Sequence, residues 1–155
     1  MRVIIQRVSE ANVKVDNKVV GAIDQGYVLL VGFTHNDNLD DLNYIIKKIK
    51  FMRLFDDNNG IMNIDINDIG GSLLSISQFT LYADVNKGRR PSYHHSMEYN
   101  KASDMYHKFN DMLIDEGFRV ETGIFGESMK VSLVNDGPVT IILDSKGDNY
   151  ERVEL

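Results

Sequence analysis

The chain has 155 residues, of which 43% are hydrophobic and 26% are charged, a composition typical of a single folded domain. It has no cysteine, which excludes disulfide frameworks, thiolate zinc sites and cysteine nucleophiles. Its formal net charge of -6 argues against a protein that coats nucleic acid non-specifically, because such proteins neutralise many phosphates with Lys and Arg.

The start of the chain, Met1 to Arg7, is too short and too charged for a signal peptide, and no apolar run reaches membrane-spanning length. We therefore expect a cytoplasmic protein with neither a membrane nor DNA as a partner. One domain is expected over residues 1–146, followed by a polar tail, residues 147–155.

The first third of the chain predicts short strands separated by glycines. They are expected at residues 2–8, 11–15, 19–23 and 27–33. From residue 39 to about 53, apolar residues at helical spacing predict an amphipathic helix that lies on a sheet. Residues 56–60 predict a plain turn, because they lack the twelve-residue ligand pattern of a calcium loop.

The second half predicts a long strand, a helix and two final strands. Residues 72–83 alternate between two faces, which would place Ser77 on one face and Gln78 and Thr80 on the other. A helix is predicted for residues 101–116, because apolar residues recur on one face and Gly117 is a natural C-terminal stop. The last strands, residues 129–134 and 139–143, flank Asn135-Asp136-Gly137-Pro138, which would suffice as a hairpin turn.

Residue types alone are weak evidence for catalysis. Ser77, Gln78 and Thr80 could form one side of a site, but Ser and Thr in strands usually hydrogen-bond the neighbouring backbone. A hydroxyl nucleophile needs a nearby base, and no histidine is placed persuasively for that role. The histidines are His35, His94, His95 and His107. No spacing of histidine and carboxylate residues predicts a metal site.

Several separate stretches, from Met1 to about Asp144, resemble the D-aminoacyl-tRNA deacylase family in the expected order. They are Gln6-Arg7-Val8, Ser77-Gln78-Phe79-Thr80-Leu81, Lys87-Gly88, Arg90-Pro91-Ser92, Phe125-Gly126, Met129 and Asn135 through Thr140. The resemblance implies a hydrolase of D-aminoacyl-tRNA, and of glycine mischarged on a wrong tRNA, that needs no cofactor or metal. It also implies an α/β fold of curved, mainly antiparallel sheets with two packed helices. The active site would be completed across a twofold homodimer interface.

The same resemblance assigns the chiral filter to Gly137 and Pro138. In this family the Gly-Pro pair is a cis peptide that projects into the partner subunit's pocket. Its carbonyl oxygens would hold the substrate's ammonium group, and an L side chain would then collide with the pocket while a D side chain points outward. Arg7 would hold this turn by hydrogen bonds, with Met129 and Asn135 as further supporting residues.

For the chemical step, the resemblance points to Thr80 and to the Ser77-Gln78-Phe79 backbone as the wall of the site. We expect Thr80 to support the reaction while the ribose hydroxyl of the substrate assists water and backbone N–H groups stabilise the oxyanion. The loop residues expected to contact the tRNA acceptor end are Lys87, Arg89 and Arg90, although such a loop could also be solvated surface.

The sequence departs mildly from the family pattern at Asn86, where a basic residue is common, and at Tyr93, where Phe is common. Two other functions fit the same residues. A non-catalytic tRNA-binding dimer would bind without turnover. A small-molecule ester or amide hydrolase would cleave free D-aminoacyl esters as readily as charged tRNA.

Overall fold

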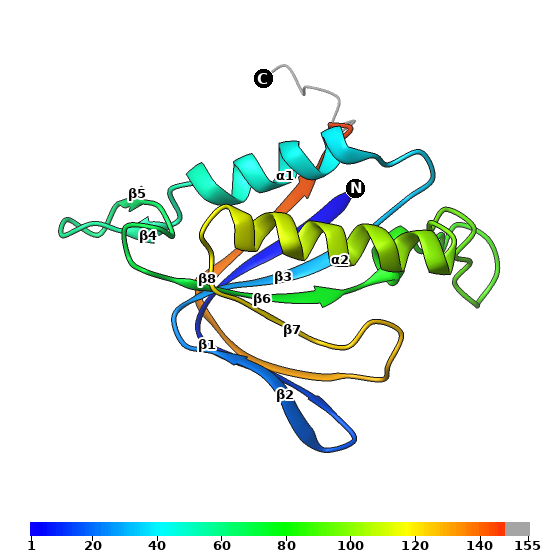
Figure 1. Ribbon diagram of the computed structural model, residues 1–155, viewed down its shortest axis with the longest axis horizontal. Helices are drawn as coiled ribbons and strands as arrows, with labels where there is room; N and C mark the ends of the chain where they lie inside the picture. The colour runs from blue at the N-terminus through cyan, green and yellow to red at the C-terminus, as the bar shows by residue number, and fades with distance from the viewer. Residues whose placement is uncertain (148–155) are drawn as a thin grey trace.

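The computed structural model describes residues 1–147, which form one curved sheet, a small hairpin and helices on one side of the sheet (Figure 1). The elements are β1 (Arg2–Val15), β2 (Lys18–Ile23), β3 (Gly26–Gly32), α1 (Leu39–Phe51), β4 (Phe55–Asp56), β5 (Met62–Ile64), β6 (Ser72–Ser77), the 3-10 helix η1 (Phe79–Tyr82), α2 (Tyr99–Asp115), β7 (Val120–Thr122) and β8 (Lys130–Asp144). Both predicted helices are present. The predicted tail, residues 147–155, lies outside the described residues except for Gly147.

The main sheet is mixed rather than mainly antiparallel. Its strand order is β2-β1-β3-β6-β7, and β8 pairs with the other edge of β1. β1 is antiparallel to β2, β3 and β8, whereas β3 with β6 and β6 with β7 are parallel pairs. The connection between β3 and β6 contains α1, as parallel neighbours require a long crossover.

β1 is one continuous strand, so the prediction of separate strands at residues 2–8 and 11–15 is wrong. Its pairing with β8 shifts between Gln6 and Val8 and again between Val8 and Glu10. Such irregularities bend a strand. The first half of β1 consequently pairs with β3, and the second half pairs with β2. Because of the bend, β2 lies against β6 and β7.

One apolar core packs against each face of this curved sheet. α1 and α2 cover one face, where Ile45 and Phe109 pack with sheet residues such as Ile5 and Leu29. The second core lies within the curl of the sheet and contains Val8, Val13, Val28, Leu74 and Ile76. Among the described residues, neither helix is long and apolar enough to cross a membrane.

α1 starts where the sequence supplies a capping box. The Asn38 side chain accepts a hydrogen bond from the Asp40 N–H, and the Asp41 carboxylate accepts one from the Asn38 N–H. These contacts satisfy backbone donors that have no partner within the helix. The buried side of α1 then carries Leu42, Ile45, Ile46 and Ile49.

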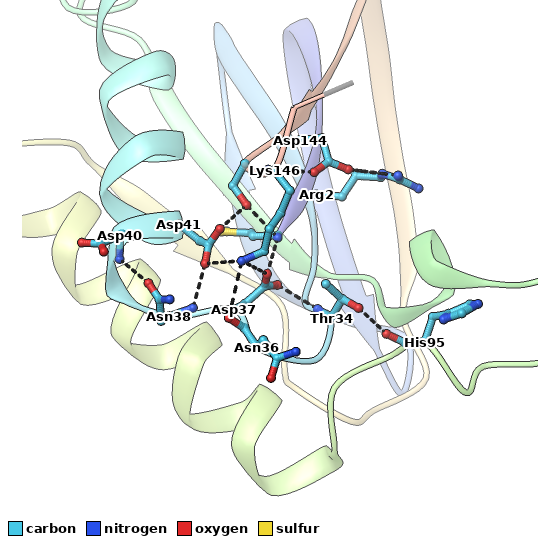
Figure 2. A network of polar contacts seen from close by, with 12 residues as sticks. Arg2, Thr34, Asn36, Asp37, Asn38, Asp40, Asp41, His95, Asp144 and Lys146 are labelled. Carbon is cyan, nitrogen blue, oxygen red and sulfur yellow. Dashed lines mark hydrogen bonds and ion pairs between the residues drawn. The ribbon is translucent and has the colours of Figure 1, made fainter. Parts of the chain in front are cut away.

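A polar network joins the start of α1 to the first residue of the chain and to the end of β8 (Figure 2). The Met1 amino group donates to Asp37 (2.6 Å) and to the Ser145 hydroxyl (2.8 Å). Ser145 and Lys146 both donate to Asp41. Burial opposes ionisation of Asp41, but the hydrogen bonds from Ser145, the Asn38 N–H and Lys146 outweigh it and hold its pKa below the usual value.

Candidate active site

The segment from Ser77 to Thr80 lies where β6 ends and the chain turns into η1. The predicted strand over residues 72–83 is therefore wrong beyond Ser77. The Gln78 N–H donates a hydrogen bond to the Val31 carbonyl (2.7 Å), and the Leu81 N–H donates one to the Gln78 carbonyl (3.2 Å). Gln78 and Thr80 do not share a strand face, but the Gln78 side-chain amide donates to the Thr80 hydroxyl (2.5 Å).

This turn exposes backbone donors beside the Thr80 hydroxyl. The N–H groups of Phe79 and Thr80 are at the first positions of η1, where a helix offers no internal acceptor, and the Gln78 side chain does not cap them. Within residues 1–147, the hydroxyl of Thr80 has no hydrogen bond to an imidazole or a carboxylate. The arrangement can stabilise negative charge but does not activate Thr80 as a nucleophile.

Two neighbouring hollows meet at this turn. One, of about 230 Å³, includes Ser77, Gln78, Phe79 and Met129 in its lining. The other, of about 260 Å³, is mainly apolar; its lining residues are Ser77, Phe79, Ser96, Met97, Tyr99, Ala102, Phe125 and Gly126. The structure thus brings together four of the expected site residues, including Met129 from just before β8. Phe125 and Gly126, noted for family resemblance alone, also line this region.

Gly137 and Pro138 lie on an excursion within a single strand. The predicted strands at residues 129–134 and 139–143 are one strand, β8, and the predicted hairpin turn is wrong. Asn135 pairs with Val8 and Thr140 pairs with Gln6 on the same neighbour, β1. The intervening residues bulge outward, Gly137 and Pro138 are exposed, and the peptide bond between them is cis.

Arg7 and Asn135 connect this excursion to the rest of the sheet. Arg7 is only 6% exposed, and its Nε donates to the Asp136 carbonyl (3.1 Å) next to Gly137. Its Nη1 donates to the Leu54 carbonyl (2.7 Å) beyond α1. The Asn135 side chain donates to the Thr140 hydroxyl (2.9 Å) and accepts from the Val139 N–H (3.2 Å), which closes the base of the excursion.

The strand register separates this excursion from the Ser77–Thr80 turn within one chain. Asn135 is level with Val8, Gly26 and Ser72 across the sheet, whereas Ser77 lies five residues further along β6. This offset corresponds to about 17 Å along the strands, and the three strand spacings between β8 and β6 add about 14 Å sideways. The Gly137–Pro138 excursion and the Ser77–Thr80 turn therefore lie in two separate regions of the monomer.

The basic loop is close to the Ser77–Thr80 turn. Lys87, Arg89 and Arg90 are exposed, and the ends of their loop are joined because Asp84 and Ser92 exchange backbone hydrogen bonds (2.7 and 2.9 Å). After the loop, the Ser96 hydroxyl donates to the Phe79 carbonyl (3.1 Å).

Asp84, His94 and His95 lie together at the base of this loop, a grouping that was not predicted from the sequence. Its ligand atoms meet only because the loop closes between Asp84 and Ser92. The adjacent histidines and an acid ten residues before them were the only signal in the sequence.

Comparison with known proteins places the chain in a family. The model of the D-Tyr-tRNA(Tyr) deacylase family matches residues 4–144. The chain belongs to this family. The resemblance inferred from the separate sequence stretches is thereby confirmed.

Two relatives share about half of their residues with this family member. The D-aminoacyl-tRNA deacylase of Geobacillus sp. (strain WCH70) is 50% identical over 146 residues, which cover 94% of this chain and 96% of that protein. The D-aminoacyl-tRNA deacylase of Thermus aquaticus is 52% identical over 145 residues, which cover 94% and 95%.

Two solved structures share the fold. The c-Myc DNA Unwinding Element Binding Protein has a TM-score of 0.86 at 34% identity, with 93% of this chain and 98% of that chain covered. A probable eukaryotic D-amino acid tRNA deacylase has a TM-score of 0.80, with 92% and 97% covered. Because the second is only 17% identical, it supports the fold alone.

Proposed function

We propose that this protein hydrolyses the ester bond of D-aminoacyl-tRNA and releases the D-amino acid and free tRNA. Family membership over residues 4–144 is the observation that carries this proposal. The turn at Ser77–Thr80 is suited to ester hydrolysis, because it presents backbone N–H groups beside a hollow that can hold an aminoacyl group.

In the proposed reaction, the ester carbonyl oxygen lies against the N–H groups of Phe79 and Thr80. Water attacks the carbonyl carbon, and these donors stabilise the negative charge that develops on the oxygen. The bond to the terminal ribose then breaks, and the ribose oxygen takes up a proton. The neighbouring ribose hydroxyl assists the water, while Thr80, held by Gln78, supports the bound ester without attacking it.

The Gly137–Pro138 excursion is proposed to act in the site of a second copy of the chain. Within one chain it is too far from Thr80 to contact the same aminoacyl group, as the register shows. Both helices cover one side of the sheet (Figure 1), where Ile5 and Leu29 pack against them. Because strand side chains alternate, the paired residues Ile4, Leu30 and Ile142 project from the opposite side. Ile142 is 48% exposed, so this sheet face has apolar surface available for a partner.

A twofold axis through this face accounts for both observations. The midpoint between the Gly137–Pro138 excursion and the Ser77–Thr80 turn lies near Ile4 and Leu30 in the register. Two sheets packed face to face about that point would place each excursion beside the other subunit's turn. Isologous pairing of one face with itself is the usual geometry of a homodimer.

Chiral selection is proposed to follow from this placement. The carbonyl groups of Gly137 and Pro138 would accept hydrogen bonds from the substrate's ammonium group while the ester is fixed near Phe79. The side chain of a D-aminoacyl group then points to solvent, whereas that of an L-aminoacyl group collides with the wall of the pocket. L substrates are therefore excluded whatever their side chain. Glycine has no side chain to collide, and we expect it to be removed from a wrong tRNA as well.

The acceptor end of the tRNA is proposed to lie along the loop that carries Lys87, Arg89 and Arg90. The segment that follows this loop contacts the Ser77–Thr80 turn, because the Ser96 hydroxyl donates to the Phe79 carbonyl, so phosphates bound at the exposed cations would lie close to the ester. The contact is local, as a chain of net charge -6 requires. We propose that the protein works in the cytoplasm, where translation uses charged tRNA.

The deciding experiment measures release of labelled tyrosine from D-tyrosyl-tRNA and from L-tyrosyl-tRNA by the purified protein, with a chelator present. We expect release from the D substrate alone. Binding of both tRNAs without release would favour the non-catalytic dimer. Equal release from both would retain a hydrolase and contradict the chiral filter, and equally fast cleavage of free D-tyrosine esters would favour a small-molecule hydrolase.

A further inference from the structure

The base of the basic loop holds three side chains with the donor types of a transition-metal site. The ligand atoms of Asp84, His94 and His95 all lie within 4.8 Å of one another. The His94 Nε2 is 4.0 Å from the Asp84 Oδ2, and the two imidazole rings have their centroids 3.8 Å apart. Two imidazoles and one carboxylate match zinc sites that bind through three side chains and keep one position open.

The surrounding hydrogen bonds orient these groups toward one another. The Ser92 hydroxyl lies 2.8 Å from the His94 Nδ1, which leaves Nε2 toward Asp84. Metal-binding histidines usually engage their second ring nitrogen in such a contact. The Asn86 N–H bonds the Asp84 Oδ1 (2.9 Å), so Oδ2 is the oxygen that faces His94. This bond is the main cause that lowers the pKa of Asp84, and the carboxylate is ionised at neutral pH.

The backbone beneath the two histidines is also fixed. The His95 carbonyl accepts a hydrogen bond from the Thr34 hydroxyl (2.6 Å), and the His94 carbonyl contacts the His35 Nε2 (2.7 Å). Figure 2 shows Thr34 and His95 beside the network at the start of α1. The histidines therefore project from backbone that is attached to the folded domain, while Asp84 lies at the other end of the loop.

We propose that Asp84, His94 and His95 bind one divalent transition ion, with Zn²⁺ as the fitting probe, and that the ion fixes the loop carrying Lys87, Arg89 and Arg90. A zinc ion holds nitrogen and oxygen ligands at about 2.0 to 2.2 Å, which in a tetrahedral site requires ligand atoms roughly 3.3 to 3.6 Å apart. Rotation of the exposed side chains, which moves their ligand atoms by about 1 Å, closes this gap. The ion then crosslinks both ends of the loop and limits its motion.

This role is distinct from the ester hydrolysis proposed above. The ion binds at the base of the loop, and no step of the reaction passes through it. The bound ion instead fixes the positions of Lys87, Arg89 and Arg90, whose cations can contact a phosphate backbone. Binding of the ion depends on Asp84, His94, His95 and the contacts that orient them, and does not require the proposed deacylase activity.

The test is titration of Zn²⁺ into the full-length, tag-free protein after removal of metal, followed by calorimetry. We expect one saturable site per chain. His94→Ala and Asp84→Asn should each lower the affinity for Zn²⁺ at least tenfold. Loss of a residue that only hydrogen-bonds a metal ligand already costs that much affinity. His107→Ala is the matched control, because His107 is also exposed and, in the part of the chain that the structure describes, forms hydrogen bonds only within α2. The affinity of this variant for Zn²⁺ should equal that of the wild type.

The second readout is limited trypsin digestion with and without Zn²⁺. Cleavage after Lys87 and Arg89 should slow at least several-fold in the wild type and not in His94→Ala, with cleavage at other sites as the internal standard. Absence of a saturable site, or unchanged affinity in His94→Ala and Asp84→Asn, would overturn the metal site. Binding without protection of the loop would overturn the proposed effect on the loop. Neither readout depends on deacylase activity, so both separate this proposal from the proposed function.

Discussion

Arg7 joins the Gly137–Pro138 excursion to two other segments of the chain. Its nearly buried guanidinium donates to the Asp136 carbonyl, to the Leu54 carbonyl and to the Asp56 carboxylate (3.3 Å). These acceptors come from β8, from the segment after α1 and from β4. Only a planar group with several donors can reach all three at once.

Replacing Arg7 by Lys should loosen the excursion, because one ammonium group cannot replace the fork of donors and leaves a buried carbonyl without a partner. We expect the preference for D-tyrosyl-tRNA over L-tyrosyl-tRNA to fall at least tenfold, or about 1.4 kcal/mol. Stability should fall by about 1 to 3 kcal/mol. Parallel deacylation rates and urea unfolding measure the two effects.

The control for this substitution is Arg53→Lys, since Arg53 is exposed and, among residues 1–147, donates only to the Asn63 side chain (3.2 Å). Its selectivity and stability should match the wild type. An Arg7→Lys protein with full D preference would refute the supporting role.

Within residues 1–147, Thr80 has no base hydrogen-bonded to its hydroxyl, as a hydroxyl nucleophile would need. Its hydrogen-bonded neighbour is the Gln78 side-chain amide, which donates a hydrogen bond and cannot remove a proton. We expect Thr80→Ala to retain activity within about tenfold, a loss of 1.4 kcal/mol or less. Single-turnover rates on D-tyrosyl-tRNA measure this. A trapped acyl-enzyme on Thr80, detected by mass spectrometry, would establish the opposite mechanism.

At the scale of elements, the excursion in β8 depends on a glycine. Gly137 has φ of +124°, and an added Cβ would lie 2.8 Å from the Val139 Cγ2 and 3.1 Å from the Arg7 Nη2. Gly137→Ala should therefore shift the turn. We expect a loss of about 1 to 3 kcal/mol in stability, and a loss of D-over-L preference measured in the tyrosine-release assay.

Gly60→Ala isolates the backbone effect. Gly60 also has a positive φ, +74°, but an added Cβ would meet nothing within 4 Å. It should cost about 1 kcal/mol of stability without changing selectivity. Equal selectivity in the Gly137→Ala and Gly60→Ala proteins would argue against a role for the excursion in substrate choice.

The sequence predicted the elements that local patterns determine. The helices were predictable because α1 and α2 have apolar residues at helical spacing and clear ends. Residues 72–83 kept a strand pattern after β6 had ended, because the turn at Gln78 is set by its contacts with Val31 and Leu81 rather than by residue type. The composition of Asn135–Pro138 suits either a hairpin or a bulge.

The features that the sequence did not predict are determined by contacts between segments far apart in the chain. Pairing of both flanks of the excursion with β1 excludes a hairpin, and no local pattern contains that information. β7 has three residues and forms by pairing with β6. The candidate residues at Ser77–Thr80 were identified from family resemblance, but their grouping with Met129 required the fold.

At the scale of the whole molecule, the proposed dimer makes each site dependent on a second chain. Ile142→Glu would bury a carboxylate without a partner on the proposed twofold face. We expect the dimer dissociation constant to rise at least a hundredfold, on the order of 3 kcal/mol, and deacylation to fall with it. Sedimentation equilibrium and the tyrosine-release assay measure both quantities at the same protein concentrations.

Ile114→Glu is the matched control for this test. Ile114 is 53% exposed and lies on α2, which covers the opposite side of the sheet from the proposed face (Figure 1). Its substitution should leave association unchanged. A wild-type protein that is monomeric and fully active would refute the shared site.

The network around Asp41 predicts acid sensitivity. The folded pKa of Asp41 is lowered, so its stabilising contribution is present above the unfolded value, about 3.9, and is lost as pH falls through the folded pKa. Asp41→Asn should lower stability at pH 7 by about 1 to 3 kcal/mol and flatten the decline below pH 4. Melting temperatures between pH 6 and pH 3 measure it, with exposed Asp40→Asn as control. An unchanged slope would contradict this role.

The pairing of β1 with β8 has a consequence for synthesis on the ribosome. β1 emerges early, yet the strand that covers one of its edges along most of its length emerges more than a hundred residues later. The Arg7–Asp136 hydrogen bond joins residues 129 apart in the chain. Such long-range closure is slow and leaves the edge of β1 open in nascent chains, where other strands or chaperones can bind it. Any shortened product that ends before β8 would lack both the excursion and the strand that protects β1.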